Sequence, residues 1–104
     1  RAATAGMAGQ AAYAASKAAL ASFALSLAGE VGRYGITVNV VAPGAMESSA
    51  SSYDEAEQAE VVGRIAVGRL GRPADVALVV AFLVSHEAAY VTGATIPVDG
   101  GARF

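Results

Sequence analysis

An alanine-rich segment with almost no charge is the feature that most constrains this chain. Residues 10–31 contain no proline and no glycine before Gly29, and no charged residue lies between Lys17 and Glu30. Alanine has the highest helix propensity, so the segment predicts a helix about 30 Å long. Large apolar side chains recur at helical spacing on one face: Leu20, Phe23, Leu27 and Val31. Mostly small ones recur on a second face: Ala14, Ala18, Ala21, Leu25 and Ala28. A helix apolar on both faces is expected to be buried nearly all round.

The composition indicates that some of the surfaces that bury this helix belong to segments outside the chain. The 104 residues are 55% hydrophobic, which excludes a disordered tail, but about a quarter are alanine and 12 are glycine. Such small side chains bury little area to offset the backbone entropy of folding, which is about 1–2 kcal/mol per residue. We therefore expect elements that press closely against neighbours, some of them in other segments or subunits.

Charge and cysteine content exclude several classes of function. The net charge is −2 and the charges are spread along the chain, so neither a nucleic-acid surface nor an anionic-membrane surface is indicated. Cysteine is absent, which excludes disulfides, thiolate metal sites and cysteine nucleophiles. The longest uninterrupted apolar run, residues 76–84, is shorter than the about 20 residues of a membrane span. With no signal-peptide pattern either, a soluble cytoplasmic protein is expected.

Strand and helix patterns alternate along the rest of the chain. Residues 1–9 predict a loop, and residues 36–42 (ITVNVVA) a strand covered on both faces and ended by Pro43. A Ser-rich loop at 45–52 leads to an apparent capping box at 52–55 and an acidic helix to about Ile65. A turn at 68–71 precedes a helix that starts at Pro73, carries apolar residues toward a core and ends near His86. Residues 94–98 predict a short strand, which Pro97 confines to a sheet edge.

This order favours an α/β fold with a doubly wound, Rossmann-like parallel sheet. Two strands are too few for a stable parallel sheet. Residues 1–104 are therefore expected to form the C-terminal portion of a single larger domain, with the sheet incomplete in this chain.

Tyr13 and Lys17 form the first candidate for chemistry. They stand four residues apart, so they share one face near the start of the predicted helix, and Lys17 is the only lysine of the chain. A nearby cation and the positive end of the helix dipole both favour a phenolate, which lets a tyrosine act as acid or base near neutral pH. The alternative is an ordinary helix with one aromatic residue and one surface lysine.

The segment after the first predicted strand is the second candidate. Residues 39–48 (NVVAPGAMES) follow the carboxyl end of that strand, where open α/β sheets bind ligands. The alternative is a plain strand-to-loop turn. For other polar residues we predict structural roles. Asn39 and Asp99 would make local hydrogen bonds, His86 would lie at a helix C-terminus, and the acids of residues 54–60 would form a solvated helix face, with no metal site.

Four motifs occur in order: YAASK (residues 13–17), VNVVAPGAMES (38–48), LGRPADVA (70–77) and YVTGATIPVDGG (90–101). Together they resemble the C-terminal portion of a classical short-chain dehydrogenase/reductase, over essentially the whole chain. Within that family, GQAAYAASKAAL (residues 9–20) most resembles 3-oxoacyl-acyl-carrier-protein reductases. The ending TIPVDGG (residues 95–101) is shared with many sugar and secondary-alcohol dehydrogenases.

The resemblance implies an oxidoreductase that uses NAD or NADP to interconvert a carbonyl and a secondary alcohol. Tyr13 would be the catalytic acid/base, and Lys17 would assist it and bind the nicotinamide ribose hydroxyls. Pro43, Gly44 and Met46 would line the nicotinamide, and Ser48 stands where the family usually has threonine. Residues 45–65 would form a substrate lid, and the long helix would pack in a homodimer or homotetramer interface.

Other parts of the family pattern have no counterpart here. The glycine-rich phosphate loop, the cofactor-selecting residue and the Asn of an earlier helix are not found, and the catalytic Ser would fall just before Arg1. The chain alone is accordingly expected to be inactive. A hypothesis of a different class is a catalytically silent chain that serves as an oligomerisation module.

Overall fold

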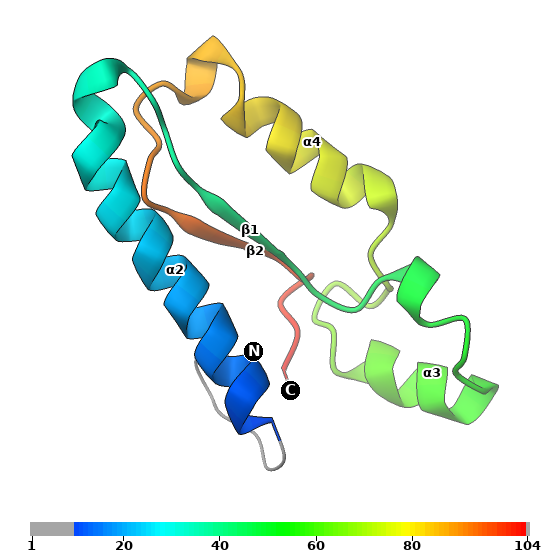
Figure 1. Cartoon of the computed structure of the whole chain (residues 1–104). Coiled ribbons are helices and arrows are strands. Elements are labelled where there is room, and N and C mark those ends of the chain that lie inside the picture. Colours follow the sequence, from blue (N-terminus) through cyan, green and yellow to red (C-terminus); the bar gives the residue numbers. More distant parts are fainter. Residues whose placement is uncertain (1–9, 104) are drawn as a thin grey trace. The chain divides into compact units, whose positions relative to one another are not determined.

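A computed structural model of the chain describes residues 10–103 (Figure 1). The long helix α2 (Ala11–Val31) leads through the 3-10 turn η1 (Gly32–Tyr34) to strand β1 (Val40–Pro43). A second 3-10 turn, η2 (Glu47–Ser49), precedes helices α3 (Glu55–Gly63) and α4 (Pro73–Leu83). The turn η3 (His86–Ala88) and strand β2 (Thr95–Val98) complete the order. The predicted loop at residues 1–9 lies outside the described residues.

The two strands are hydrogen-bonded neighbours and run parallel. The Val40 amide donates to the Ala94 carbonyl at 2.8 Å, and the Gly44 amide donates to the Val98 carbonyl at 3.0 Å. Both partners advance by four residues in the same direction, which is the register of a parallel pair. The predicted α/β class with a parallel, partial Rossmann-like sheet is confirmed.

By contacts between Cα atoms the chain divides into two units. The first holds the described residues up to Val40 together with Phe82–Ile96. Its buried positions are small or apolar side chains, namely Ala24, Ala28, Leu83 and Ala88. The loop before β2 packs on α2 so closely that a Cβ on Gly93 would lie 3.0 Å from Leu25 Cδ1. Small residues on this face of α2 therefore allow the close approach that the alanine pattern predicts.

The second unit comprises Val41–Ala81 and the described residues from Pro97 onward. Its apolar core is a cluster of buried residues from separate loops: Ala50, Ile65, Leu70 and Ala102. Two isolated bridges support this core, one parallel between Met46 and Gly71 and one antiparallel between Ile65 and Ala102. Side chains of α3 contribute Val61 and Val62 to its edge.

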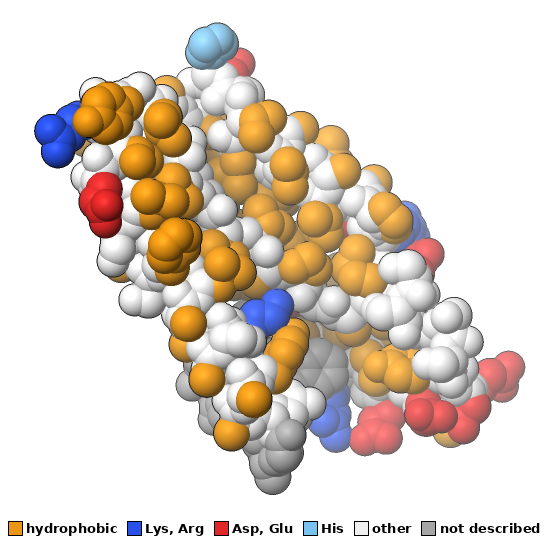
Figure 2. All heavy atoms as spheres, in the orientation of Figure 1, with side chains coloured by type: hydrophobic (Ala, Val, Ile, Leu, Met, Phe, Trp, Pro, Cys, Tyr) orange, Lys and Arg blue, Asp and Glu red, His pale blue; other side chains and the backbone are white. Residues whose placement is uncertain are grey.

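The large apolar stripe of α2 differs from its prediction. Leu20 and Phe23 of this stripe are 52% and 63% exposed, and Leu25 of the second face is 62% exposed. Figure 2 shows hydrophobic side chains gathered along this helix. Within residues 10–103 only Ala24 and Ala28 of α2 are buried, so burial nearly all round is not achieved by this part of the chain alone.

Several element boundaries also differ from the prediction. β1 starts at Val40 rather than Ile36, because Val38 and Asn39 pair with the loop before β2 largely through side chains. The capping box of α3 is formed by Asp54 and Glu57, two residues after the predicted Ser52. α4 begins at Pro73 as predicted but ends at Leu83, three residues before His86.

One segment, Ala11–Tyr34, is long and apolar enough to cross a membrane by length and composition alone. The count of uninterrupted apolar residues did not detect it, since polar residues interrupt the segment. The apolar core helix of a water-soluble protein meets the same criterion.

Candidate active site

Tyr13 and Lys17 lie on the first two turns of α2. The four-residue spacing places both on one face of the helix, as predicted. The Lys17 Nζ lies 5.3 Å from the centroid of the Tyr13 ring, within the range of a cation–π contact. The Tyr13 side chain is about half exposed and that of Lys17 is half-buried. The structure therefore brings this predicted pair together at a surface that another molecule can reach.

Within residues 10–103, no hydrogen bond engages the Tyr13 hydroxyl or the Lys17 ammonium group. The Ser16 hydroxyl donates to the Tyr13 backbone carbonyl at 2.9 Å and does not involve the phenol. Among residues 10–103, none of the ion pairs includes Lys17. A phenolic hydroxyl and an ammonium group with free donors can together exchange a proton and bind hydroxyl groups of a ligand.

The second predicted group follows the carboxyl end of β1. Pro43 ends the strand, Gly44 and Met46 are half-buried, and Ser48 is exposed in the turn η2. Gly44 lies against the β2 end, where an added Cβ would be 2.6 Å from the Asp99 Cβ and 2.8 Å from its Cα. The position thus accommodates glycine because another part of the backbone approaches it.

Pro43, Gly44, Met46 and Ser48 all belong to the second unit, whereas Tyr13 and Lys17 belong to the first. Within the second unit the four residues lie on one short stretch of chain, as predicted. They supply apolar surface, backbone groups and one hydroxyl, which suit a flat ligand with an amide.

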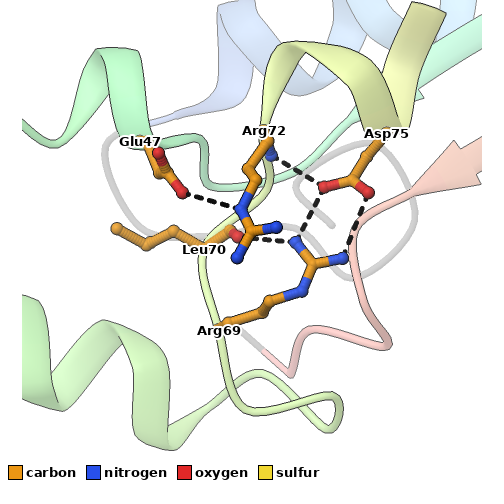
Figure 3. Close-up of polar contacts among 5 residues, drawn as sticks. All are labelled: Glu47, Arg69, Leu70, Arg72 and Asp75. Carbon is orange, nitrogen blue, oxygen red and sulfur yellow. Dashed lines mark hydrogen bonds and ion pairs between the residues drawn. The ribbon is translucent and has the colours of Figure 1, made fainter.

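A set of charged contacts in the second unit was not predicted (Figure 3). The Arg69 guanidinium donates two hydrogen bonds to the Asp75 carboxylate, at 2.8 and 3.1 Å, and a third to the Leu70 carbonyl at 3.0 Å. The Arg72 amide also donates to Asp75, at 2.8 Å, and the Arg72 Nε donates to Glu47 at 3.2 Å. The first-turn place of Asp75 is visible in the sequence, but its partners are not.

These contacts shift the ionisation of the paired groups. The hydrogen bonds from the Arg69 side chain, with a further one from the Arg72 amide, hold the pKa of Asp75 well below its usual range. The same pair raises the pKa of Arg69 above its ordinary value. Asp75 is therefore charged at neutral pH and accepts three hydrogen bonds.

Asn39 and Asp99 make the local hydrogen bonds predicted for them, whereas His86 begins the turn η3 and does not lie at the C-terminus of α4. The Asn39 side chain donates to the Val91 carbonyl and accepts from the Ala94 amide, both at 3.1 Å. The Asp99 carboxylate accepts from the Gly101 amide at 2.9 Å, closing a turn. Figure 2 shows acidic side chains gathered over α3, and within the described part of the chain no group of acids and histidines is arranged to hold a metal.

Comparison with known proteins identifies the family. A family model described as enoyl-(acyl carrier protein) reductase, of the short-chain dehydrogenases/reductases, matches residues 1–103. The chain belongs to this family. The predicted resemblance is thus confirmed over nearly the whole sequence, including the segments that carry Tyr13, Lys17 and residues 43–48.

Individual members of the short-chain dehydrogenase/reductase family are highly similar to this chain in sequence. The 3-oxoacyl-[acyl-carrier-protein] reductase FabG of Pseudomonas aeruginosa is 52% identical over 97 residues, covering 92% of this chain and 39% of that protein. The FabG protein of Escherichia coli is 50% identical over 99 residues, covering 94% of this chain and 41% of that protein. The crystal structure of the Brucella melitensis 3-oxoacyl-[acyl-carrier protein] reductase matches with a TM-score of 0.84 and 40% identity, over 90% of this chain and 35% of that one.

The chain spans about two fifths of the length of the curated relatives it matches. The family match covers the segments of both candidate groups.

Proposed function

We propose that this chain is the C-terminal catalytic portion of an NAD- or NADP-dependent reductase that converts the ketone of a 3-oxoacyl thioester into a secondary alcohol. The observation that carries the proposal is the Tyr13–Lys17 pair, exposed on the first two turns of α2 in a chain about half identical to 3-oxoacyl-acyl-carrier-protein reductases. Each group taken by itself has donors that suit a nicotinamide cofactor: the first unit supplies a phenol and a cation, and the segment after β1 supplies apolar surface and a hydroxyl.

The resemblance to the family gives each residue its proposed role, and the chemistry of each side chain suits that role. When bound, the reduced nicotinamide supplies the hydride that the carbonyl carbon accepts. Tyr13 donates its phenolic proton to the carbonyl oxygen, so that one hydride and one proton complete the alcohol. Lys17 favours the resulting phenolate and binds the ribose hydroxyls of the cofactor. Pro43, Gly44 and Met46 would line the nicotinamide, and the Ser48 hydroxyl would be able to hydrogen-bond its amide.

The exposed stripe of α2 supports a homo-oligomer. Leu20 and Phe23 share one face of the helix and present an apolar surface of the kind that subunit interfaces cover. We therefore propose a cytoplasmic homodimer or homotetramer that acts on a small carbonyl substrate, with no nucleic-acid or membrane partner.

The decisive experiment replaces Tyr13 by phenylalanine in the protein at its natural length. Loss of the phenolic proton donor is expected to lower kcat about 100- to 10,000-fold, the usual contribution of a general acid. Cofactor affinity, followed by NADPH and NADH fluorescence, should change little because the ring remains. Tyr90→Phe is the matched control, since Tyr90 is fully exposed and outside both candidate groups.

Near-normal turnover by Tyr13→Phe would rule out Tyr13 as the acid. Unmutated protein that neither binds a nicotinamide nor reduces 3-oxoacyl thioesters would favour the alternative of a silent oligomerisation module.

A further inference from the structure

The contact between Gly71 and Met46 points to a role that the family match does not assign. Met46 stands in the loop after β1, and Gly71 stands 25 residues later, just before α4. A Cβ built on Gly71 would lie 2.6 Å from the Met46 Sδ and 3.4 Å from its Cε. The Met46 thioether therefore occupies the space that a side chain at position 71 would fill.

The backbone around Gly71 is held firmly enough to define that space. The Gly71 amide donates to the Ala45 carbonyl at 2.9 Å, and the Glu47 amide donates to the Gly71 carbonyl at 2.8 Å. These two bonds form the parallel bridge that places Met46 beside Gly71. On the α4 side, Asp75 accepts from the Arg72 amide at 2.8 Å, so residues on both sides of Gly71 are fixed (Figure 3).

A methyl group at position 71 would displace the thioether more readily than the backbone. The close atoms belong to the outer part of a flexible methionine side chain, whereas the nearest backbone atom, the Ala45 carbonyl oxygen, would lie 3.5 Å away in ordinary contact. Gly71 does not have a positive φ, so alanine fits its backbone conformation. The Gly71→Ala substitution should therefore move the end of Met46 while the fold remains.

We propose that Gly71 is a positioning residue for the cofactor: by leaving room for the Met46 thioether, it sets where that side chain meets the nicotinamide. This inference rests on the proposed function, in which Met46 lines the nicotinamide. Gly71 itself acts only through Met46 and is not a catalytic residue.

The test is a double-mutant cycle on the protein at its natural length, with Gly71→Ala, Met46→Ala and the double variant. NADPH and NADH are each titrated against a short 3-oxoacyl thioester, and thermal melting checks the fold. We expect Gly71→Ala to raise the KM for the preferred cofactor roughly threefold to tenfold, with kcat within about twofold. In the Met46→Ala background, Gly71→Ala should have no further effect, because no thioether is left to displace. Gly32→Ala is the control, since its Cβ would meet nothing within 4 Å.

An unchanged cofactor KM in Gly71→Ala would overturn the proposal, as would an increase that persists in full without Met46. If Gly71→Ala fails to fold, adding Met46→Ala should restore folding. A double variant that also fails to fold would show that the clash is not with Met46, and this result too would overturn the proposal. Failure of the proposed function is a separate result: the unmutated protein would then show no reductase activity with either cofactor.

Discussion

Gly44 shows how a single residue depends on a distant part of the chain. Its amide donates to Val98, and its Cα faces the backbone of Asp99, 55 residues later in the sequence. The sequence identifies Pro43 and Gly44 as the end of a strand. It does not show that a second strand end occupies the space where a side chain would project, because that requires the tertiary pairing of β1 and β2.

At this residue we predict that Gly44→Ala destabilises the protein by about 1–3 kcal/mol, the usual cost of overpacking. The added Cβ would lie 2.6–2.8 Å from Asp99 atoms that are not the end of a flexible side chain. Thermal or urea unfolding measures the change. Gly63→Ala is the matched control, because its Cβ meets nothing within 4 Å. Equal stability of the two variants would contradict the close approach.

The candidate site was predicted from the sequence to different degrees. The Tyr13–Lys17 pair depends only on helical spacing, so the sequence was sufficient to place those side chains together. The Arg69–Asp75 and Arg72–Glu47 pairs depend on how loops fold back, and the second joins residues 25 apart. No local periodicity reports such pairs, which is why they were missed.

Among the elements, α3 shows the limits of a local signal. Its N-cap is Asp54, whose carboxylate accepts from the Glu57 amide at 2.7 Å, while the Glu57 side chain accepts from the Asp54 amide at 3.4 Å. Ser52 also has an acid three residues later and therefore matches the same motif. Two overlapping candidates cannot be separated without the backbone conformation, and the extended φ and ψ of Asp54 select it.

For this element we predict that Asp54→Ala costs about 1 kcal/mol, because the first-turn amides lose their acceptor. Hydrogen exchange should become faster at the Glu57 amide, and global unfolding should shift to lower temperature. Ser52→Ala serves as the control and should change neither quantity. Faster hydrogen exchange in Ser52→Ala instead would contradict the Asp54 cap and support the Ser52 cap predicted from the sequence.

Strand β1 also differs from what its local sequence predicts. The β-branched run at residues 36–42 predicts a strand, yet β1 begins only at Val40. Before it, the Val38 amide donates to the Thr92 hydroxyl at 3.0 Å, and Asn39 makes both of its bonds through its side chain. Beside these three bonds, only the bond from the Gly93 amide to the Val38 carbonyl, at 2.7 Å, joins backbone to backbone here among the described residues, an arrangement that residue propensity does not reveal.

For the whole molecule, charge pairing makes stability depend on pH. The pKa of Asp75 is lowered in the folded state, so its carboxylate favours folding above the ordinary aspartate pKa of about 4. That contribution is lost as the pH falls from about 4 toward the lower folded-state pKa. The alkaline side should be unaffected, because the carboxylate is then charged in both states.

We therefore predict that Asp75→Asn lowers the melting temperature at pH 7 and that the difference from the unmutated protein narrows steadily below about pH 4. Melting curves from pH 7 to pH 3 measure it. Arg69→Gln should lower the melting temperature with the same pH dependence, since it removes the principal partner of the carboxylate. A difference that stays constant across this range would contradict the pairing.

The bridge between Met46 and Gly71 also closes the intervening stretch of chain at its base. Residues 47–70, which include α3, thus form a loop whose two ends lie next to each other. Residues 51–54 of this loop are exposed. Lengthening a closed loop adds entropy only slowly, about 0.6 kcal/mol for each doubling. The exposed part of this stretch can therefore change in length while Met46 and Gly71, which hold its two ends together, stay in place.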